Sequence, residues 1–185
     1  NIQNYFKTVY GRNTVFIPNG VNKPVLRKPK LIEQLYGLKK NFYFLFLGRI
    51  VPEKGIEYLI DAFMDINTDK TLVIAGGNSD SQNFYNQMKH KAHSDKRIIF
   101  TGFIQGEILE ELYSNAYVYV LPSDLEGMPL SLLEAMSYGN CCIISDIPES
   151  TEVVEKHALI FRKSDTNDLR KKIEYTLSNE EEVNK

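Results

Sequence analysis

The chain has 185 residues, of which 43% are hydrophobic and 25% are charged, and its formal net charge is −2. This size and apolar content suit one globular domain with a sizeable core, so we expect residues 1–185 to form a single domain. With 22 basic against 24 acidic residues and no basic block, the composition argues against nucleic acid as a partner, and no apolar run approaches the roughly 18 residues of a transmembrane segment.

Apolar runs and amphipathic stretches alternate along the chain. A helix is predicted over residues 2–10, and strands are predicted over residues 15–17, 42–47, 71–75, 97–100, 117–121, 142–145 and 158–161. Later helices are indicated by apolar residues at helical spacing, namely Ile56, Leu59, Ile60 and Phe63, then Ile108, Leu109 and Leu112, then Leu169, Ile173 and Leu177. Ser164 or Asp165 suits the cap of the last one. The alternation predicts an α/β fold with a doubly wound parallel sheet.

Two cations follow the strand predicted at residues 42–47. Residues 48–55 read Gly-Arg-Ile-Val-Pro-Glu-Lys-Gly, and they place Arg49 and Lys54 in one loop before a helix. Loop cations are often no more than solvated surface charges. In open α/β sheets, however, ligands bind outside the carboxyl ends of the strands, so this position favours a role in neutralising a pair of phosphates.

Two carboxylates follow the strand predicted at residues 117–121. Pro129 suits the first helical position, which leaves Glu126 in the preceding loop and Glu134 in the second helical turn. Glu134 should then lie roughly 7 to 8 Å further along the helix axis than Pro129. A helix N-terminus between the two carboxylates favours a phosphate group. The arrangement predicts a site for a sugar, a diphosphate and a ribose, in that order.

No metal site is predicted. His90 and His93 are three residues apart on a probable helix without a recognisable third ligand, and His157 is distant in sequence. Residues 65–69 resemble the start of a calcium loop, but Lys70 takes the place of the required glycine. An Asp-x-Asp motif does not occur either. Positive charge for a diphosphate should therefore come from Arg49, Lys54 and the helix end, and no cofactor is expected.

Taken together, the motifs resemble those of a known enzyme family. Gly48-Arg49 with Lys54-Gly55, and then Glu126 and Glu134 with seven residues between them, resemble the nucleotide-sugar half of a retaining glycosyltransferase of family four (group 1) with the two-domain GT-B architecture. Residues 17–21, 74–77 and 145–148 also match that family, and the similarity extends from about Thr14 to Leu177. Each motif is weak alone, but their order and spacing are specific.

The resemblance implies a role for each matching position. Arg49 and Lys54 would hold the donor diphosphate, Glu126 would contact hydroxyls of the sugar, and Glu134 would accept hydrogen bonds from the ribose. Catalytic roles would fall to Arg49, Lys54 and Glu126. The implied donor-binding residues are Gly48, Phe103, Ile104, Glu126, Gly127, Met128, Leu130 and Glu134. Phe103 and Ile104 would lie against the base, while Gly127, Met128 and Leu130 would present backbone N–H groups.

One departure from the family pattern concerns packing. Cys141 stands where the family usually has proline, next to Cys142. Adjacent side chains of a strand point to opposite faces, so a disulfide between the two cysteines is not expected and a reducing cytoplasm fits.

For the whole protein, the resemblance implies a hexosyltransferase that uses a nucleotide-sugar donor, expected to be a UDP-sugar, in bacterial glycan or glycolipid synthesis. The acceptor, a glycan or a lipid-linked sugar, would bind mainly to a preceding N-terminal domain that does not fit in this chain, so the fragment alone should be inactive. We expect a cytoplasmic location, peripheral at the inner face of the membrane in the full-length protein. Two alternatives are a nucleotide-sugar-binding module without catalysis and a GT-B sugar-nucleotide epimerase, and the seven-residue spacing favours the transferase.

Overall fold

A six-stranded parallel sheet forms the centre of the molecule in the computed structural model, which describes residues 2–15, 17–77 and 82–183. Its order is β3-β2-β1-β4-β5-β6. The strands are β1 (Tyr43–Leu47), β2 (Thr71–Ala75), β3 (Ile98–Gly102), β4 (Val118–Leu121), β5 (Cys141–Ser145) and β6 (Leu159–Phe161). All pairs are parallel, with Phe44 of β1 opposite Leu72 of β2 on one side and Val118 of β4 on the other. The predicted doubly wound α/β fold is confirmed.

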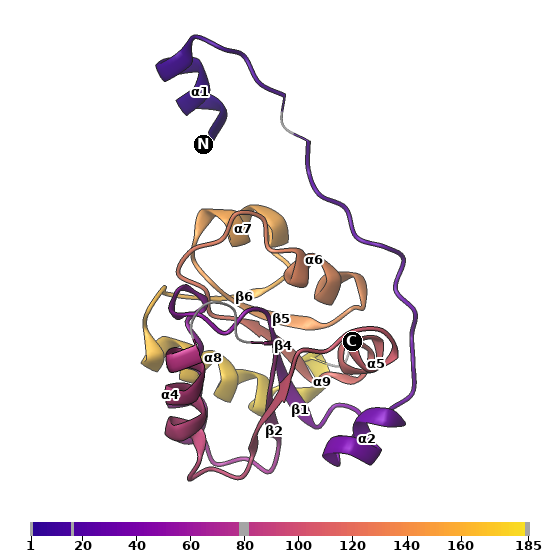
Figure 1. Ribbon diagram of the computed structural model, residues 1–185. Coiled ribbons are helices and arrows are strands. Elements are labelled where there is room, and N and C mark those ends of the chain that lie inside the picture. The colour runs from indigo at the N-terminus through magenta and orange to yellow at the C-terminus, as the bar shows by residue number, and fades with distance from the viewer. Residues whose placement is uncertain (1, 16, 78–81, 184–185) are drawn as a thin grey trace.

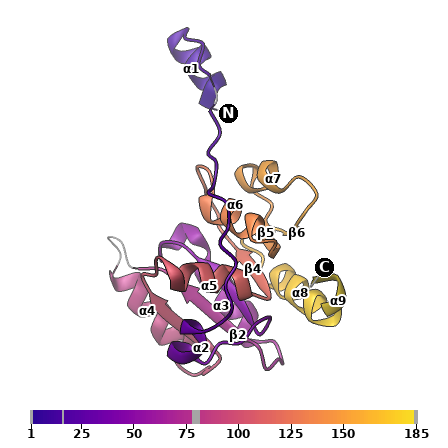
Figure 2. The same ribbon diagram turned by 90° about the vertical axis from the view of Figure 1, so that its right-hand side faces the viewer.

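Helices cover both faces of this sheet (Figures 1 and 2). They are α2 (Leu31–Tyr36), α3 (Ile56–Met64), α4 (Gln82–Ala92), α5 (Glu107–Asn115), α6 (Leu130–Ser137), α7 (Pro148–Val154), α8 (Thr166–Ser178) and α9 (Glu180–Val183). Because the chain runs from β1 to one edge and from β4 to the other, right-handed crossovers place α3 and α4 on the face opposite α6 and α7. α8 returns to pack on α3. Among the described residues, no helix has both the length and the apolar character that a membrane crossing requires.

The core forms where the apolar runs predict it. The residues of β1, β2, β4 and β5 are almost all buried, whereas those of the edge strand β3 are partly buried. The four residues that define the apolar face of α3 are also buried. Six predicted strands are confirmed to within two residues. Asp165 caps α8, since its Oδ1 accepts a hydrogen bond from Asp168 N at 2.9 Å. Pro129 was misplaced by one position: α6 begins at Leu130, and Pro129 is the residue before it.

The N-terminal residues do not join the sheet. α1 (Ile2–Tyr10) is the predicted helix, and it stands apart from the rest of the molecule (Figure 1). The strand predicted at residues 15–17 is wrong for its described part: Val15 and Ile17 are 85% and 82% exposed and belong to no strand, while residue 16 lies outside the described residues. A strand needs a partner for its backbone groups, and neither Val15 nor Ile17 pairs with an edge strand of the sheet, β3 or β6.

The two cysteines lie at the start of β5. Both thiols are free, with Cys142 buried and Cys141 partly buried. Burial raises the pKa of Cys142 to about 12, with a smaller contribution from Cys141, and burial also raises the pKa of Cys141.

Candidate functional site

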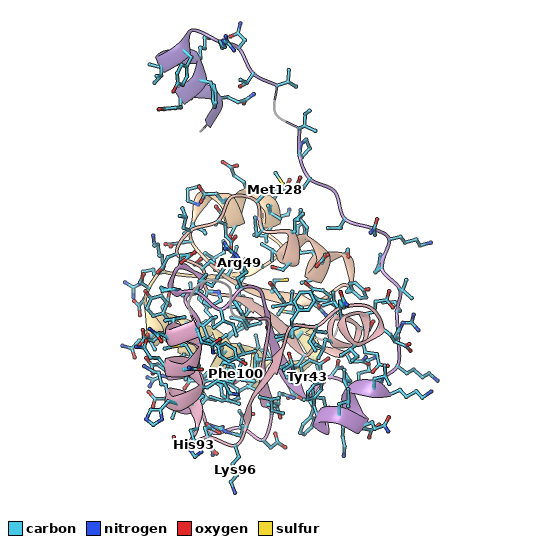
Figure 3. The ribbon with its side chains drawn as sticks, viewed as in Figure 1. Tyr43, Arg49, His93, Lys96, Phe100 and Met128 are labelled. Atoms are coloured by element: carbon cyan, nitrogen blue, oxygen red, sulfur yellow. The ribbon has the colours of Figure 1, made fainter. Side chains whose placement is uncertain are left out.

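The candidate site lies where the strand order reverses. β1 and β4 are neighbours in the sheet, yet the chain leaves β1 toward β2 and leaves β4 toward β5. The connections that follow their carboxyl ends therefore diverge to opposite faces and open a crevice between them, which is the usual ligand position in such sheets. Residues 48–55 and 122–129 are these two connections. Figure 3 shows Arg49 and Met128 at this end of the molecule, with His93 and Lys96 at the opposite end.

A close backbone contact joins the two connections. Gly55 has φ +64°, and a Cβ atom at this position would lie 2.0 Å from the carbonyl oxygen of Pro122. The N–H of Asp124 donates to the carbonyl of Glu53 at 2.8 Å, and the Tyr58 hydroxyl donates to Asp124 Oδ2 at 3.0 Å. Only glycine fits at position 55, and the contact fixes the distance between the loop of Lys54 and the loop that follows β4.

Lys54 and Glu126 form an ion pair across this junction. Lys54 Nζ lies 2.6 Å from Glu126 Oε1, and the side chains are only 15% and 6% exposed. The Ser123 hydroxyl donates to the same oxygen at 2.7 Å. The Ser145 hydroxyl in turn donates to the Ser123 carbonyl, so the last residue of β5 supports the arrangement. We expected Lys54 and Glu126 to contact a ligand separately, but in the structure they pair with each other.

Glu134 has a different neighbour. It lies in the second turn of α6, as predicted, and its Oε2 accepts a hydrogen bond from the Tyr113 hydroxyl at 2.9 Å. Tyr113 is 1% exposed, and burial raises its pKa far above the usual value for tyrosine. No motif in the sequence pointed to this tyrosine, which lies among the buried residues of α5.

The start of α6 offers further donors between the two carboxylates. Within the described part of the chain, no acceptor is engaged by the N–H groups of Gly127, Met128 and Leu130. Sulfur Sδ of Met128 accepts the N–H of Asn19 at 3.1 Å, which places the N-terminal segment beside this loop. Free N–H groups at a helix start suit an anion.

An apolar pocket of about 230 Å³ lies beside these groups. Its lining comes from the carboxyl ends of β1 and β2 and from the loop after β3, and comprises Leu47, Gly48, Arg49, Ala75, Gly76, Gly77, Phe103 and Ile104. Four residues that the sequence predicted for donor binding or catalysis are therefore brought together here. At Gly76, a Cβ atom would lie 1.8 Å from the Gly48 carbonyl oxygen, so the connections after β1 and β2 approach as closely as backbones can. Gly76 and Gly77 both line the pocket.

Charge in the site is unevenly distributed. Arg49 is exposed, and in the part of the chain that the structure describes no carboxylate pairs with it. Lys54 by contrast is already neutralised by Glu126. Among those same residues, no group of three or more His, Cys, Asp and Glu side chains gathers in a way that could hold a metal ion.

Known proteins resemble this chain in sequence. Residues 28–185 match the family model described as Glycosyl transferases group 1. Escherichia coli UDP-Gal:alpha-D-GlcNAc-diphosphoundecaprenol alpha-1,3-galactosyltransferase is 34% identical over an alignment of 145 positions, which covers 71% of this chain and 36% of that protein. This chain therefore spans little more than a third of that relative's length.

Solved structures share the fold. Anabaena Alr3699/HepE in complex with UDP and glucose superposes with a TM-score of 0.75 at 19% identity, over 83% of this chain and 43% of that one. The C-terminal domain of a group 1 glycosyl transferase family protein (LpcC) from Francisella tularensis superposes with a TM-score of 0.72 at 23% identity, over 86% of this chain and 88% of that domain. The sheet is thus the Rossmann-like sheet found in the C-terminal half of GT-B proteins.

Proposed function

Because the chain belongs to the group 1 glycosyl transferases, we propose that residues 1–185 are the donor-binding domain of a retaining GT-B hexosyltransferase. The observation that carries the proposal is the arrangement at the strand-order reversal, where Lys54 pairs with Glu126 just before the helix of Glu134. Gly48 and Arg49, from the same connection as Lys54, line the apolar pocket. The donor would be a nucleoside diphosphate sugar. UDP is favoured because the galactosyltransferase relative is named for a UDP-sugar and the Anabaena protein was solved with UDP.

The donor would lie across the crevice in a fixed order. The base would occupy the apolar pocket, against Phe103 and Ile104 and above Gly48. The ribose would donate hydrogen bonds to Glu134, and the diphosphate would lie between Arg49 and the free N–H groups at the start of α6. The sugar would reach Glu126, whose Oε2 is not used by Lys54 or Ser123.

Catalysis would rest on the leaving group. Breaking the bond to the anomeric carbon leaves negative charge on the diphosphate, and fixed positive groups in a partly enclosed site stabilise such charge. Arg49, Lys54 and the α6 N-terminus would supply them, so we propose that no divalent metal and no cofactor is required. Glu126 would orient the sugar and hold Lys54.

The acceptor would bind elsewhere. We propose that a preceding N-terminal domain of the full-length protein binds a glycan or lipid-linked acceptor, that the pathway is bacterial glycan or glycolipid synthesis, and that the enzyme works in the cytoplasm, peripheral at the inner membrane face. A nucleotide-sugar-binding module without catalysis would keep the same pocket, and so would an epimerase of this architecture.

Calorimetric titration of the chain with UDP, UDP-glucose, UDP-galactose and GDP-mannose, each with a chelator present, tests the proposal. We expect UDP and at least one UDP-sugar to bind without metal, and we expect no sugar transfer by this chain alone. Binding of no nucleotide at millimolar concentration would overturn the donor site. Binding that disappears with the chelator and returns with magnesium would overturn metal independence.

A further inference from the structure

Tyr113 is held rigidly beneath the candidate ribose position. It lies near the end of α5 and is 1% exposed. Its ring stacks on that of Tyr138 with centroids 5.3 Å apart and packs against that of Tyr119 at 6.2 Å. The Asn140 side chain donates to the Tyr113 backbone carbonyl at 2.8 Å. Neighbours therefore fix both the ring and the backbone, and the hydroxyl has one position.

That hydroxyl is directed at Glu134. It lies 2.9 Å from Glu134 Oε2 and 3.2 Å from the Ser131 carbonyl. A hydroxyl has one proton to give, and a charged acceptor forms the stronger bond. Since burial raises the pKa of Tyr113, the hydroxyl stays protonated and remains a donor.

The contact restricts Glu134 without using up its capacity. A glutamate side chain loses rotamer freedom when it is fixed, and this loss opposes ligand binding if the ligand has to impose it. Tyr113 fixes it before any ligand arrives. A carboxylate has about four acceptor positions, and within the described residues no donor contacts Oε1. Oε1 and the remaining acceptor position of Oε2 are therefore left to accept hydrogen bonds from two neighbouring hydroxyls.

We propose that Tyr113 is a positioning residue, which holds the Glu134 carboxylate ready to accept both ribose hydroxyls of the donor nucleotide. The inference rests on the proposed donor site and adds a residue that does not touch the ligand. A purely structural tyrosine would instead affect all ligands equally, because it would act through the fold.

Tyr113→Phe separates the two possibilities, since it removes one oxygen and keeps the ring. UDP and 2′,3′-dideoxy-UDP would be titrated against the wild-type chain and the variant. We expect the variant to bind UDP about five- to tenfold more weakly, and the dideoxy analogue as well as wild type does. Tyr119→Phe is the matched control: its hydroxyl donates to Ser131 Oγ at 2.8 Å in the same cluster and does not contact Glu134. It should leave the ratio of the two affinities unchanged.

A double-mutant cycle with Glu134→Gln adds an independent measurement. If Tyr113 acts through the carboxylate, Tyr113→Phe should cost little further UDP affinity once Glu134 is replaced. Equal losses for UDP and the dideoxy analogue, or additive losses in the cycle, would overturn the inference while leaving the donor site intact. Failure of wild type to bind UDP would instead overturn the proposed function, and the inference with it.

Discussion

Glu126 and Glu134 are the same residue type on either side of one helix start, yet the protein holds them in opposite ways. Glu126 is paired with a cation, and its side chain is 6% exposed. Glu134 is held by a neutral tyrosine hydroxyl. One carboxylate would therefore meet a ligand as half of a neutral pair, and the other as a full negative charge. A shared motif does not imply a shared electrostatic state.

The difference also divides the two cations. The charge of Lys54 is largely neutralised by its ion pair with Glu126. Arg49 is exposed and, among the described residues, pairs with no carboxylate. A diphosphate would thus meet one available cation and one that it must share. Mutual attraction in a partly buried pair is largely offset by desolvation, so sharing Lys54 need not be costly.

We expect the largest effect at the close contact between Gly55 and Pro122, which holds the loop of Lys54 against the loop of Glu126. Gly55→Ala should lower the free energy of unfolding by about 3 to 5 kcal/mol, since the new Cβ adds a clash with Pro122 to an unfavourable positive φ. Gly139→Ala is the control: Gly139 also has positive φ but nothing within 4 Å of its Cβ, so it should cost about 1 to 2 kcal/mol. Chemical denaturation measures both, and equal losses would contradict the close contact.

Replacement of Glu134, the carboxylate without a cation partner, should have the next largest effect, a loss of UDP affinity. Glu134→Ala removes charge-assisted hydrogen bonds and should weaken UDP binding about ten- to hundredfold. Glu152→Ala, an exposed position on α7, should leave the affinity unchanged. Calorimetry with UDP and 2′,3′-dideoxy-UDP checks the assignment. A loss that is as large for the dideoxy ligand would show that Glu134 does not face the ribose.

A third carboxylate, that of Glu111, is held by backbone N–H groups and extends the comparison. Glu111 is buried and accepts N–H groups of Lys30 and Ile32 at 2.9 and 3.0 Å, at the start of α2. Burial opposes its ionisation, but those hydrogen bonds and the charge of Arg27 outweigh burial and lower its pKa. Glu111→Gln should cost about 1 to 2 kcal/mol of stability at pH 7.

The pH dependence of that cost follows from the sign of the shift. A lowered pKa in the folded state contributes stability above the unfolded value of about 4.3, and the contribution is lost as the pH falls through the folded pKa. The difference between wild type and Glu111→Gln should therefore shrink below about pH 4. Denaturation curves from pH 3 to 7 would reveal a constant difference if the idea is wrong.

The smallest expected effect is a gain. Glu126→Gln removes the charge that competes with a diphosphate for Lys54, so UDP should bind about threefold more tightly, while a UDP-sugar should not share the gain. Glu152→Gln changes the net charge equally and serves as the control. Weaker binding of UDP by Glu126→Gln would show that Glu126 helps Lys54 more by positioning it than it hinders by neutralising it.

Local patterns in the sequence were sufficient for most of the fold. Strands of a parallel sheet are continuous apolar runs, at the partly buried edges β3 and β6 as well as at its centre, so all six were predicted to within two residues. Val15 and Ile17 have the same apolar character, but they lie exposed and in no strand. Side-chain pairing was harder to predict. Lys54 contacts Glu126 only because β1 lies beside β4 in the sheet. The order of strands in a sheet cannot be predicted from a short stretch of sequence. Tyr113 was missed because an aromatic residue in a helix is normally part of a core.

The two thiols of β5, one buried and one partly buried, make this chain convenient for spectroscopy. Protonated, sheltered sulfur reacts slowly with maleimides at neutral pH, and both cysteines of β5 meet that description. A cysteine introduced in place of Phe103, which is 75% exposed at the rim of the apolar pocket, would then be labelled selectively. A fluorophore at that rim would report nucleotide entry directly, without removal of any native residue from the interior of the sheet.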